Sequence, residues 1–359
     1  MNGRERVLAA IAHRTPDRIP RYDAFWEETV ANYERASGMS MAALKQKWGF
    51  DIVVSYLDNS MRMPVSREDL GEEEIVHDRC GYAARRFKGK ATLHYISHAG
   101  DAENWPELKK RFILDPRGES RIDADSFFLR TEQGRSWEQA RQALADGAGG
   151  LFRLLNFYGP FEATWRHHGY EQTMVDCLEE PELMADMAET VVDLTIKTLD
   201  HALHNGFAFD GAWMVEDLGC TRGLLISRSV YRSLVFPQHR RLGDFFKARG
   251  LKYFIHSCGD VREIIPDMLE AGVDVLQPLQ ANTSLRLPDL RKEFPEATFW
   301  GNVDPRKLAG SKEEIKEELR RVAPPGGVGG GYIYHSDHSV PPDVGYENYE
   351  YAMKCLDAL

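Results

Sequence analysis

Hydrophobic positions in the second half of the chain alternate between helical spacing and short continuous runs. Residues 182–205 carry an apolar stripe at helical spacing and are followed by Gly206, a typical helix end. The stripe consists of Leu183, Met187, Val191 and Leu194. Residues 211–215 then form a short apolar run, as expected of a buried strand. This order predicts a helix that packs against the strand that follows it.

The same alternation continues to the C-terminus. Further helices are predicted around 245–249, at 264–271 and at 311–321, and further strands at 251–255, 273–276, 298–300 and 331–334. Ser311 and Glu314 form a capping box that begins the last of these helices. Because the strands are apolar throughout rather than alternating, they indicate a parallel sheet, which eight such units would close into a barrel. An open doubly wound sheet is the alternative, but neither a GxGxxG nor a GxxxxGK[ST] loop follows the early strands.

The first half is less regular. Strands are predicted at 51–57 and 151–157, an antiparallel excursion at 74–97 and a helix at 101–112. The glycine-rich stretch 324–331 is expected to be a loop rather than a linker, because only one short strand follows it. The sequence therefore predicts an α/β protein, a (β/α)8 TIM barrel with an N-terminal helical extension and a β-hairpin insertion, as a single domain over residues 1–359.

Composition and charge exclude several classes of function. The chain is 43% hydrophobic and 28% charged, with a formal net charge of −11. An acidic chain is not expected to bind nucleic acid or an anionic membrane, which both require a basic surface. The charged N-terminus and the lack of a run of about 18 apolar residues predict a cytoplasmic protein. It is expected to act on a small molecule, as a monomer or a homodimer. The five cysteines form no CxxC pair, which favours free thiols.

Polar and titratable residues directly follow each of the late predicted strands. They are Glu216 and Asp217, His256 and Cys258, Gln277 and Gln280, Asn302 and Asp304, and His335 and His338. In a barrel, all of these positions lie on the C-terminal face, where active sites are built.

His256 and Cys258 are the candidate metal ligands. They are two residues apart, so both side chains point to the same side of an extended backbone. One imidazole and one thiolate suit Zn²⁺, with His338 as the expected third ligand and His335 as its competitor. The alternative is that His256 ends a strand and Cys258 is a small buried apolar side chain.

Glu216 is a candidate fourth ligand or a partner that orients an imidazole. Glu216 and its neighbour Asp217 point opposite ways on a strand, so only one is expected to face the pocket and the other to pair with an Arg or Lys of a barrel helix. Asp58 follows the strand at 51–57 and could reach the same rim. The candidate catalytic residues are therefore Asp58, Glu216 and His338. The candidate substrate-binding residues are Tyr22, Trp165, Gln280, Asn302 and Asp304, although the two aromatic residues are equally consistent with a core position.

Four segments together resemble the uroporphyrinogen decarboxylase-like superfamily. They are the His-x-Cys-Gly segment at 256–259, the Gly-Asn-x-Asp-Pro segment at 301–305, the His-Ser-Val-Pro segment at 338–341 and Gly-Pro-Phe at 159–161. The resemblance covers essentially the whole chain and implies a (β/α)8 barrel. Decarboxylases of this superfamily bind substrate carboxylates through an N-terminal arginine-rich segment, and they use residues corresponding to Asp58 and His338. Here the matching segment, residues 17–22, holds only two arginines and lacks the Arg-Gln-Ala-Gly-Arg-Tyr pattern.

The corrinoid-dependent methyltransferases of the superfamily bind zinc through a His-x-Cys pair and a later Cys. His256 and Cys258 match that pair, and His338 stands where the later Cys is found. This resemblance implies a methyltransferase that uses Zn²⁺ and moves a methyl group between a corrinoid (cobalamin) and a thiol, or a methoxy or methylamine compound. The chain has no Asp-x-His-x-x-Gly signature, so the corrinoid is expected on a separate partner protein. The alternatives are a metal-free decarboxylase and a non-catalytic barrel that binds a tetrapyrrole or corrinoid.

Overall fold

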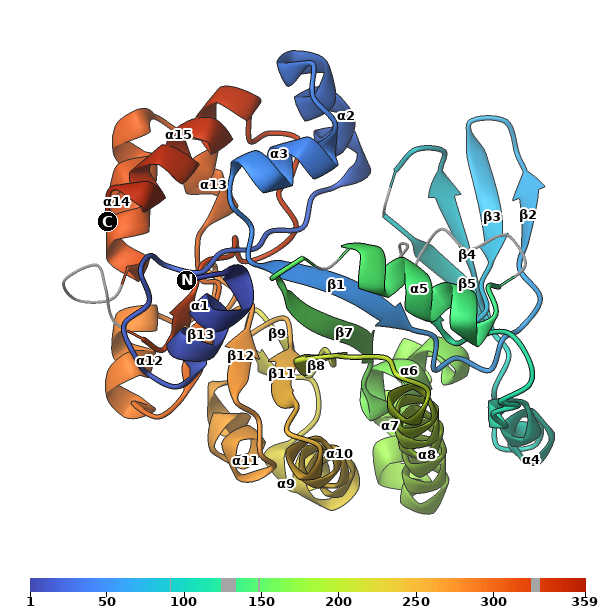
Figure 1. Cartoon of the computed structure of the whole chain (residues 1–359). Coiled ribbons are helices and arrows are strands. Elements are labelled where there is room, and N and C mark those ends of the chain that lie inside the picture. Colours follow the sequence, from blue (N-terminus) through green and yellow to red (C-terminus); the bar gives the residue numbers. More distant parts are fainter. Residues whose placement is uncertain (91, 124–133, 148, 324–329) are drawn as a thin grey trace.

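A parallel sheet forms the centre of the protein (Figure 1). The computed structural model describes residues 1–359 except 91, 124–133, 148 and 324–329. The strands follow the order β14-β13-β12-β11-β8-β7-β1, and β6 pairs with β1 in the antiparallel direction. Their bounds are β1 Ile52–Leu57, β6 Ile122–Asp123, β7 Phe152–Tyr158, β8 Gly211–Val215, β11 Lys252–His256, β12 Val275–Gln277, β13 Thr298–Trp300 and β14 Tyr332–Ile333. The prediction of an α/β protein with a parallel sheet is confirmed.

The chain around Arg21 connects the two ends of the row of parallel strands. Arg21 forms a parallel bridge with Tyr334, directly after β14. Its carbonyl oxygen accepts a hydrogen bond of 2.9 Å from the backbone N–H of Asp51, directly before β1. The parallel strands and this segment thus form a closed ring of backbone hydrogen bonds. Its interior holds aromatic side chains, among them Trp213 and Trp300, whose ring centroids are 4.8 Å apart.

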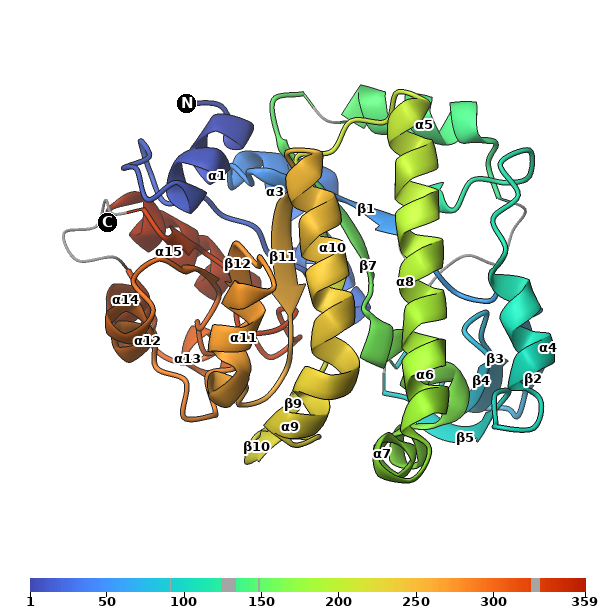
Figure 2. The same cartoon turned by 90° about the horizontal axis from the view of Figure 1, so that it is seen from below.

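Helices cover the outer face of the sheet, and the long helices α8 and α10 lie side by side over β7 and β11 (Figure 2). The helices that follow the central strands are α6 Pro160–His168, α7 Tyr170–Glu179, α8 Pro181–His204, α9 Arg228–Val230, α10 Phe236–Ala248, α11 Ile265–Glu270, α12 Leu287–Glu293, α13 Pro305–Leu308, α14 Lys312–Val322 and α15 Tyr346–Asp357. A π-helical stretch, Tyr231–Val235, joins α9 to α10, and a 3-10 turn, Arg262–Ile264, precedes α11. The Ser311–Glu314 capping box is present at the start of α14, as predicted.

The N-terminal part adds helices and a second sheet to this framework. Its helices are α1 Gly3–Ile11, α2 Glu27–Ser37, α3 Met41–Lys47, α4 Trp105–Leu108 and α5 Trp137–Gly147, and a 3-10 turn, Lys109–Phe112, continues α4. The predicted antiparallel excursion is a four-stranded sheet rather than a single hairpin. Its strands are β2 Ser66–Asp69, β3 Glu73–His77, β4 Tyr82–Phe87 and β5 His94–His98. The helix predicted at 101–112 is shorter, because it begins only at Trp105.

Three shorter observations complete the fold. Most of the loop predicted at 324–331 lies outside the described residues. Among the helices of the described part of the chain, none is long and apolar enough to cross a bilayer. A short ribbon, β9 Gly219–Cys220 with β10 Gly223–Leu224, follows β8 and lies against the loop after β11.

Candidate metal centre

Asp217, His256 and Cys258 meet at the carboxyl ends of β8 and β11. These strands are parallel neighbours, and His256 pairs with Val215, so the residues that follow both strands meet at one edge. The ligand atoms of the three side chains all lie within 4.8 Å of one another. Cys258 Sγ is 3.3 Å from His256 Nε2, and Asp217 Oδ1 is 3.4 Å from the same nitrogen.

His338 approaches the same sulfur from the loop after β14. Its Nε2 lies 3.2 Å from Cys258 Sγ. The planes of the two imidazole rings are nearly perpendicular, at 87°, with centroids 6.5 Å apart. Cys258 therefore stands between two imidazole nitrogens that come from different parts of the sheet.

The two sulfur–nitrogen distances fit a zinc ion, whereas the group whose ligand atoms all lie within 4.8 Å of one another consists of Asp217, His256 and Cys258 and does not include His338. Zinc binds thiolate sulfur at about 2.3 Å and imidazole nitrogen at about 2.0 Å, so tetrahedral coordination separates the two by about 3.5 Å. The observed separations of 3.3 and 3.2 Å are close to that value. The other nitrogen of each ring is also held, as is usual for metal ligands. His256 Nδ1 donates to Gln277 Oε1 at 2.6 Å, and His338 Nδ1 lies 3.2 Å from Asp337 Oδ1.

The charges of this cluster suit a divalent cation. Burial disfavours a charged His256, but Cys258 and Asp217 outweigh it and raise the pKa of His256 well above its ordinary value. Burial also disfavours a charged His338, but Asp337 and Cys258 raise its pKa to about 9. Burial opposes ionisation of Asp217, but hydrogen bonding to His256 lowers its pKa to about 2. The surroundings thus favour positive charge beside Cys258, and a metal ion bound there would displace the protons of the two imidazoles.

Glycine at position 259 lets the loops after β8 and β11 meet. Gly259 has a φ of +80°, and a Cβ there would lie 2.2 Å from the carbonyl carbon of Gly219. Any other residue would push the two loops apart. Gln280 Oε1 also holds this turn, because it accepts a hydrogen bond of 2.7 Å from the Gly259 N–H. Gln280 thus lies beside the cluster and supports the loop that carries Cys258.

The structure reverses the expected orientations of Glu216 and Asp217. They do point opposite ways, but Asp217 faces the cluster and Glu216 is fully buried beneath helix α6. Glu216 accepts hydrogen bonds from the N–H groups of Phe161 and Glu162 at 3.0 and 2.8 Å, and His239 Nε2 lies 2.9 Å from its Oε1. A carboxylate at a helix N-terminus satisfies free N–H groups and the helix dipole. Glu216 therefore does not belong to the cluster.

Replacing Glu216 by Gln is expected to destabilise the fold while leaving the metal cluster intact. The amide keeps the volume but loses one of the acceptors that α6 and His239 use. We expect a loss of about 1–3 kcal/mol in the free energy of unfolding, measured by urea denaturation. Glu179→Gln, at the exposed end of α7, is the matched control. Equal stability of the wild type and Glu216→Gln would contradict this role.

Asp58 is buried at the end of β1 and does not reach the cluster. Its carboxylate binds Arg62 Nε and Arg79 Nη1, both at 3.1 Å, and accepts a hydrogen bond from the Ser60 hydroxyl at 2.5 Å. Burial opposes its ionisation, but the neighbouring arginines outweigh it and lower the pKa of Asp58 to about 2. The expectation that Asp58 joins the other rim residues is not met, because these arginines occupy its carboxylate.

The polar side chains of the Gly-Asn-x-Asp-Pro segment form hydrogen bonds with nearby backbone groups. Asn302 is fully buried with a φ of +64°, and its amide group donates to the carbonyl oxygens of Leu279 and Leu285. Asp304 caps α13 by accepting the Arg306 N–H at 2.9 Å. Both side chains are occupied by local contacts, so the structure does not bring these two predicted substrate-binding residues to the cluster.

Tyr22, Trp165 and His335 are core side chains. Tyr22 packs against Trp300 and His335 with ring centroids 5.8 and 6.0 Å away. Trp165 is 6% exposed, and its indole N–H donates to Glu162 at 2.9 Å. His335 is 2% exposed, and its Nδ1 bonds the carbonyl oxygen of Ser336. Of the two histidines after β14, only His338 contacts Cys258.

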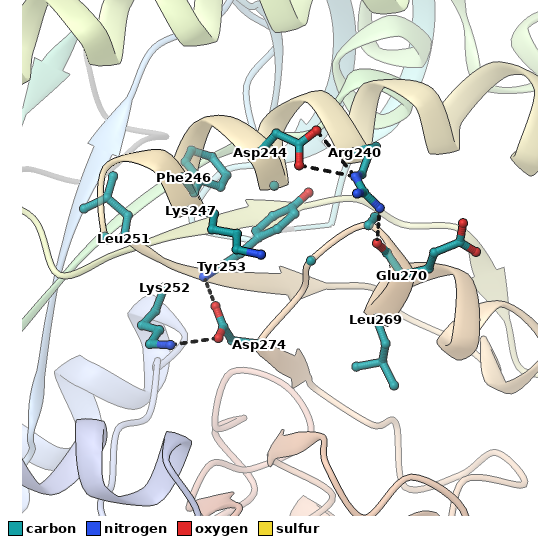
Figure 3. Close-up of a pocket in the computed structure, with 14 residues that line it drawn as sticks. Arg240, Asp244, Phe246, Lys247, Leu251, Lys252, Tyr253, Leu269, Glu270 and Asp274 are labelled. Atoms are coloured by element: carbon teal, nitrogen blue, oxygen red, sulfur yellow. Dashed lines mark hydrogen bonds and ion pairs between the residues drawn. The ribbon is translucent and has the colours of Figure 1, made fainter.

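A cavity at the opposite end of the strands contains none of the candidate residues (Figure 3). It has a volume of about 410 Å³ and lies between α10 and α11 near the start of β11. Two ion pairs are drawn there, Lys252 with Asp274 at 3.0 Å and Arg240 with Asp244 at 3.3 Å. This position at the amino ends of the strands separates it from the chemistry around Cys258.

Sequence patterns missed two residues of the centre. Strand alternation leaves open which of Glu216 and Asp217 faces the pocket, with Glu216 as the candidate, and the position of Gln277 after a strand gives it no role. The signal for Asp217 was indirect: Gly159 and Pro160 begin a helix whose N-terminus attracts a carboxylate. Gly159 also leaves room for that carboxylate, because a Cβ there would lie 2.4 Å from Glu216 Oε2. With Glu216 placed under α6, strand alternation turns Asp217 toward the cluster.

Comparison with known proteins finds uroporphyrinogen decarboxylases as relatives by sequence. An enzyme of Thermus thermophilus is 30% identical over 131 residues, 36% of this chain and 37% of that protein. The enzyme of Syntrophotalea carbinolica is 28% identical over 186 residues, 50% of each chain. The chain thus spans about 37% to 50% of the length of these two curated relatives.

A solved structure and a family profile extend the comparison. The fold is similar to that of a methyltransferase from Methanosarcina mazei, with a TM-score of 0.65 over 100% of this chain and 99% of that one. At 14% identity, this likeness concerns the fold alone. The profile described as "Uroporphyrinogen decarboxylase (URO-D)" matches residues 157–359, the part that contains every residue of the candidate metal centre. The chain therefore belongs to the uroporphyrinogen decarboxylase (URO-D) family.

Proposed function

We propose that this protein is a zinc-dependent methyltransferase. It moves a methyl group between a corrinoid carried by a separate protein and a small substrate, either a thiol or a methoxy or methylamine compound. The observation that carries the proposal is the position of Cys258 between the imidazoles of His256 and His338, at 3.3 and 3.2 Å. In this proposal residues 1–359 form one (β/α)8-barrel domain, with the cluster on its C-terminal face.

The side chains of the cluster have distinct parts in this proposal. His256, Cys258 and His338 hold the metal, which when bound supplies a Lewis acid that activates a thiol or polarises an ether oxygen. Gln277 and Asp337 fix the orientation of the two imidazoles. Asp217 accepts the Cys258 N–H at 2.9 Å and so orients the ligand loop. Its other contact, to His256 Nε2, places the carboxylate beside the cluster, where it can accept a hydrogen bond from a substrate.

The arginines of the N-terminal segment argue against the decarboxylase alternative. A substrate with many carboxylates needs several available cations. Arg18 donates to Asp51 at 2.8 Å, and Arg21 is 1% exposed and pairs with Asp357 at 2.5 Å. Both therefore serve contacts within the protein near the start of β1, at the end of the strands away from Cys258.

A methyl-transfer assay tests the proposal in both directions. Zinc-loaded protein is mixed with methylcobalamin and a thiol or, in the reverse sense, with cob(I)alamin and a methoxylated aromatic compound. We expect a zinc-dependent change in the corrinoid spectrum in one of these assays and its loss in His256→Ala. The absence of methyl transfer in both directions, together with CO2 release from uroporphyrinogen, would favour the decarboxylase instead. Tight corrinoid binding without turnover would favour a binding protein.

A further inference from the structure

Several arginines surround Asp58 at the end of β1. Arg62 and Arg79 bind its carboxylate directly, and Arg121 Nη1 donates to the carbonyl oxygens of Asp58 and Ser60 at 3.0 and 2.8 Å. Two arginines thus share one carboxylate, and the guanidinium of a third lies beside it on backbone carbonyl oxygens. Such a group carries more positive charge than its internal partner neutralises.

The excess positive charge is energetically unfavourable because Arg121 is buried. The residue is 4% exposed, and among the described residues it forms no ion pair at contact distance with a carboxylate. Burial, opposed by Asp58 and reinforced by Arg62 and Arg79, lowers the pKa of Arg121 to about 10. A buried guanidinium held by neutral carbonyl oxygens is stabilised by an additional anion.

A cavity lies beside Arg62 and Arg121. It has a volume of about 310 Å³ and is lined by Arg62, Arg111 and Arg121, with Met61 and Leu114 among its apolar walls. Arg111 donates to the carbonyl oxygens of Met61 and Arg62 at 3.3 and 3.2 Å. Among the residues that the structure describes, Arg111 also forms no ion pair with a carboxylate. We call this feature the arginine pocket, defined by Arg62, Arg111 and Arg121.

The acidic residues at the rim of the arginine pocket do not neutralise the charge of its buried arginine. Asp115 and Glu119 line it, but both residues are exposed to solvent. Asp115 Oδ1 accepts the Arg117 N–H at 3.0 Å and lies 3.4 Å from Arg117 Nε. Their charges are screened by water, whereas that of Arg121 is not.

We propose that the arginine pocket binds a small oxyanion, the carboxylate or phosphate group of a small molecule. Guanidinium forks match both groups in geometry and charge. The cavity is large enough for such a group with a short organic part. Arg62 and Arg121 are held in place by Asp58, Ser60 and the backbone, so the donors are positioned before a ligand arrives.

This site is separate from the candidate metal centre. Strands β7 and β8 lie between β1, which precedes the arginine pocket, and β11, which precedes Cys258. Three strand spacings correspond to about 14 Å along the sheet, and β8, which precedes Asp217, is two spacings or about 10 Å from β1. Oxyanion binding can therefore be measured on the metal-free protein, and its outcome does not depend on the proposed methyl transfer.

Calorimetric titration of the full-length protein tests the proposal. Inorganic phosphate and succinate serve as probes at constant ionic strength, with chloride as the reference anion. We expect one saturable site for phosphate, succinate or both, and the stronger probe shows which oxyanion the pocket prefers. Arg111→Gln is expected to weaken binding about 10-fold, because it removes a charge from the rim and leaves Asp58 and its partners in place. Arg117→Gln, an exposed arginine of the same loop, is the matched control.

Three results would overturn the proposal: no saturable binding of either probe, equal binding by Arg111→Gln and the wild type, or equal weakening in Arg117→Gln. Arg111→Lys provides a second variant should Arg111→Gln fold poorly. It retains the charge without the guanidinium fork, so its affinity is expected to be lower than that of the wild type but higher than that of Arg111→Gln. If Arg111→Lys bound the probe as tightly as the wild type, charge alone would explain binding. That result would contradict an oxyanion site that depends on guanidinium geometry.

Discussion

Cys258→Ser is expected to weaken zinc binding by at least about 100-fold, because loss of a direct ligand should exceed the effect of losing a residue that only orients one. A serine hydroxyl stays protonated near neutral pH and is a poorer zinc ligand than a thiolate. Cys258 also contacts both imidazoles, at 3.3 and 3.2 Å, so its loss removes the centre of the cluster. The measurement is competition for zinc with a chromophoric chelator, at one pH because ligand protonation competes with the metal.

Cys220→Ser is the matched control for this variant. Cys220 is exposed in the ribbon after β8, near the cluster in sequence but not one of its ligands. Its replacement is expected to leave zinc affinity unchanged. Zinc affinity of Cys258→Ser equal to that of the wild type, in a protein with an unchanged circular dichroism spectrum, would show that Cys258 is only a small residue of the site wall.

His338→Ala and His335→Ala are expected to have opposite effects on metal binding and stability. His338 Nε2 lies 3.2 Å from Cys258 Sγ, so its loss should lower zinc affinity by at least about 10-fold and leave folding intact. His335 is 2% exposed and packs on Trp300 with ring centroids 5.2 Å apart. Its loss should leave zinc binding unchanged but reduce the free energy of unfolding by about 2 kcal/mol or more.

The same chelator competition and a urea titration on both variants check this pair. Loss of zinc in His335→Ala but not in His338→Ala would move the ligand assignment to His335. Loss in neither variant would leave His256, Cys258 and Asp217 as the protein ligands.

The sequence predicts the second half of the fold closely because its signals are local. Apolar runs define strands such as β8 and β13, and Gly206 and Gly250 follow the ends of α8 and α10 within two residues. The first half is harder to predict, because its antiparallel sheet depends on pairing between strands whose residues are largely exposed. No apolar pattern shows that β2 precedes the antiparallel segment predicted at 74–97, or that β5 is a separate strand within that segment.

Only part of the candidate metal centre can be predicted from the sequence, because strand alternation does not show which face of a strand points to the cluster. The spacing of His256 and Cys258 within one extended segment suffices to place them together. Strand alternation also shows that Glu216 and Asp217 face opposite ways, but it does not show which faces the cluster. That depends on the N-terminus of α6, which lies over Glu216 and binds its carboxylate.

Residues whose partners are distant in sequence are predicted least well. Asp58 looks like a free rim carboxylate until Arg79 and Arg121 approach it from other loops. Asn302 looks like a substrate contact, yet its amide is bound by carbonyl groups 17 and 23 residues away in the chain. Only the tertiary structure shows that these polar groups are already paired.

The metal content of protein purified without chelators tests the central claim most directly. Plasma mass spectrometry of the wild type should find about one zinc per chain, and X-ray absorption at the zinc edge should show one sulfur at about 2.3 Å and nitrogen ligands at about 2.0 Å. The absence of bound metal, even after incubation with zinc, would contradict the account. His256, Cys258 and His338 would then be the wall of a metal-free site, and the decarboxylase and binding alternatives would lead.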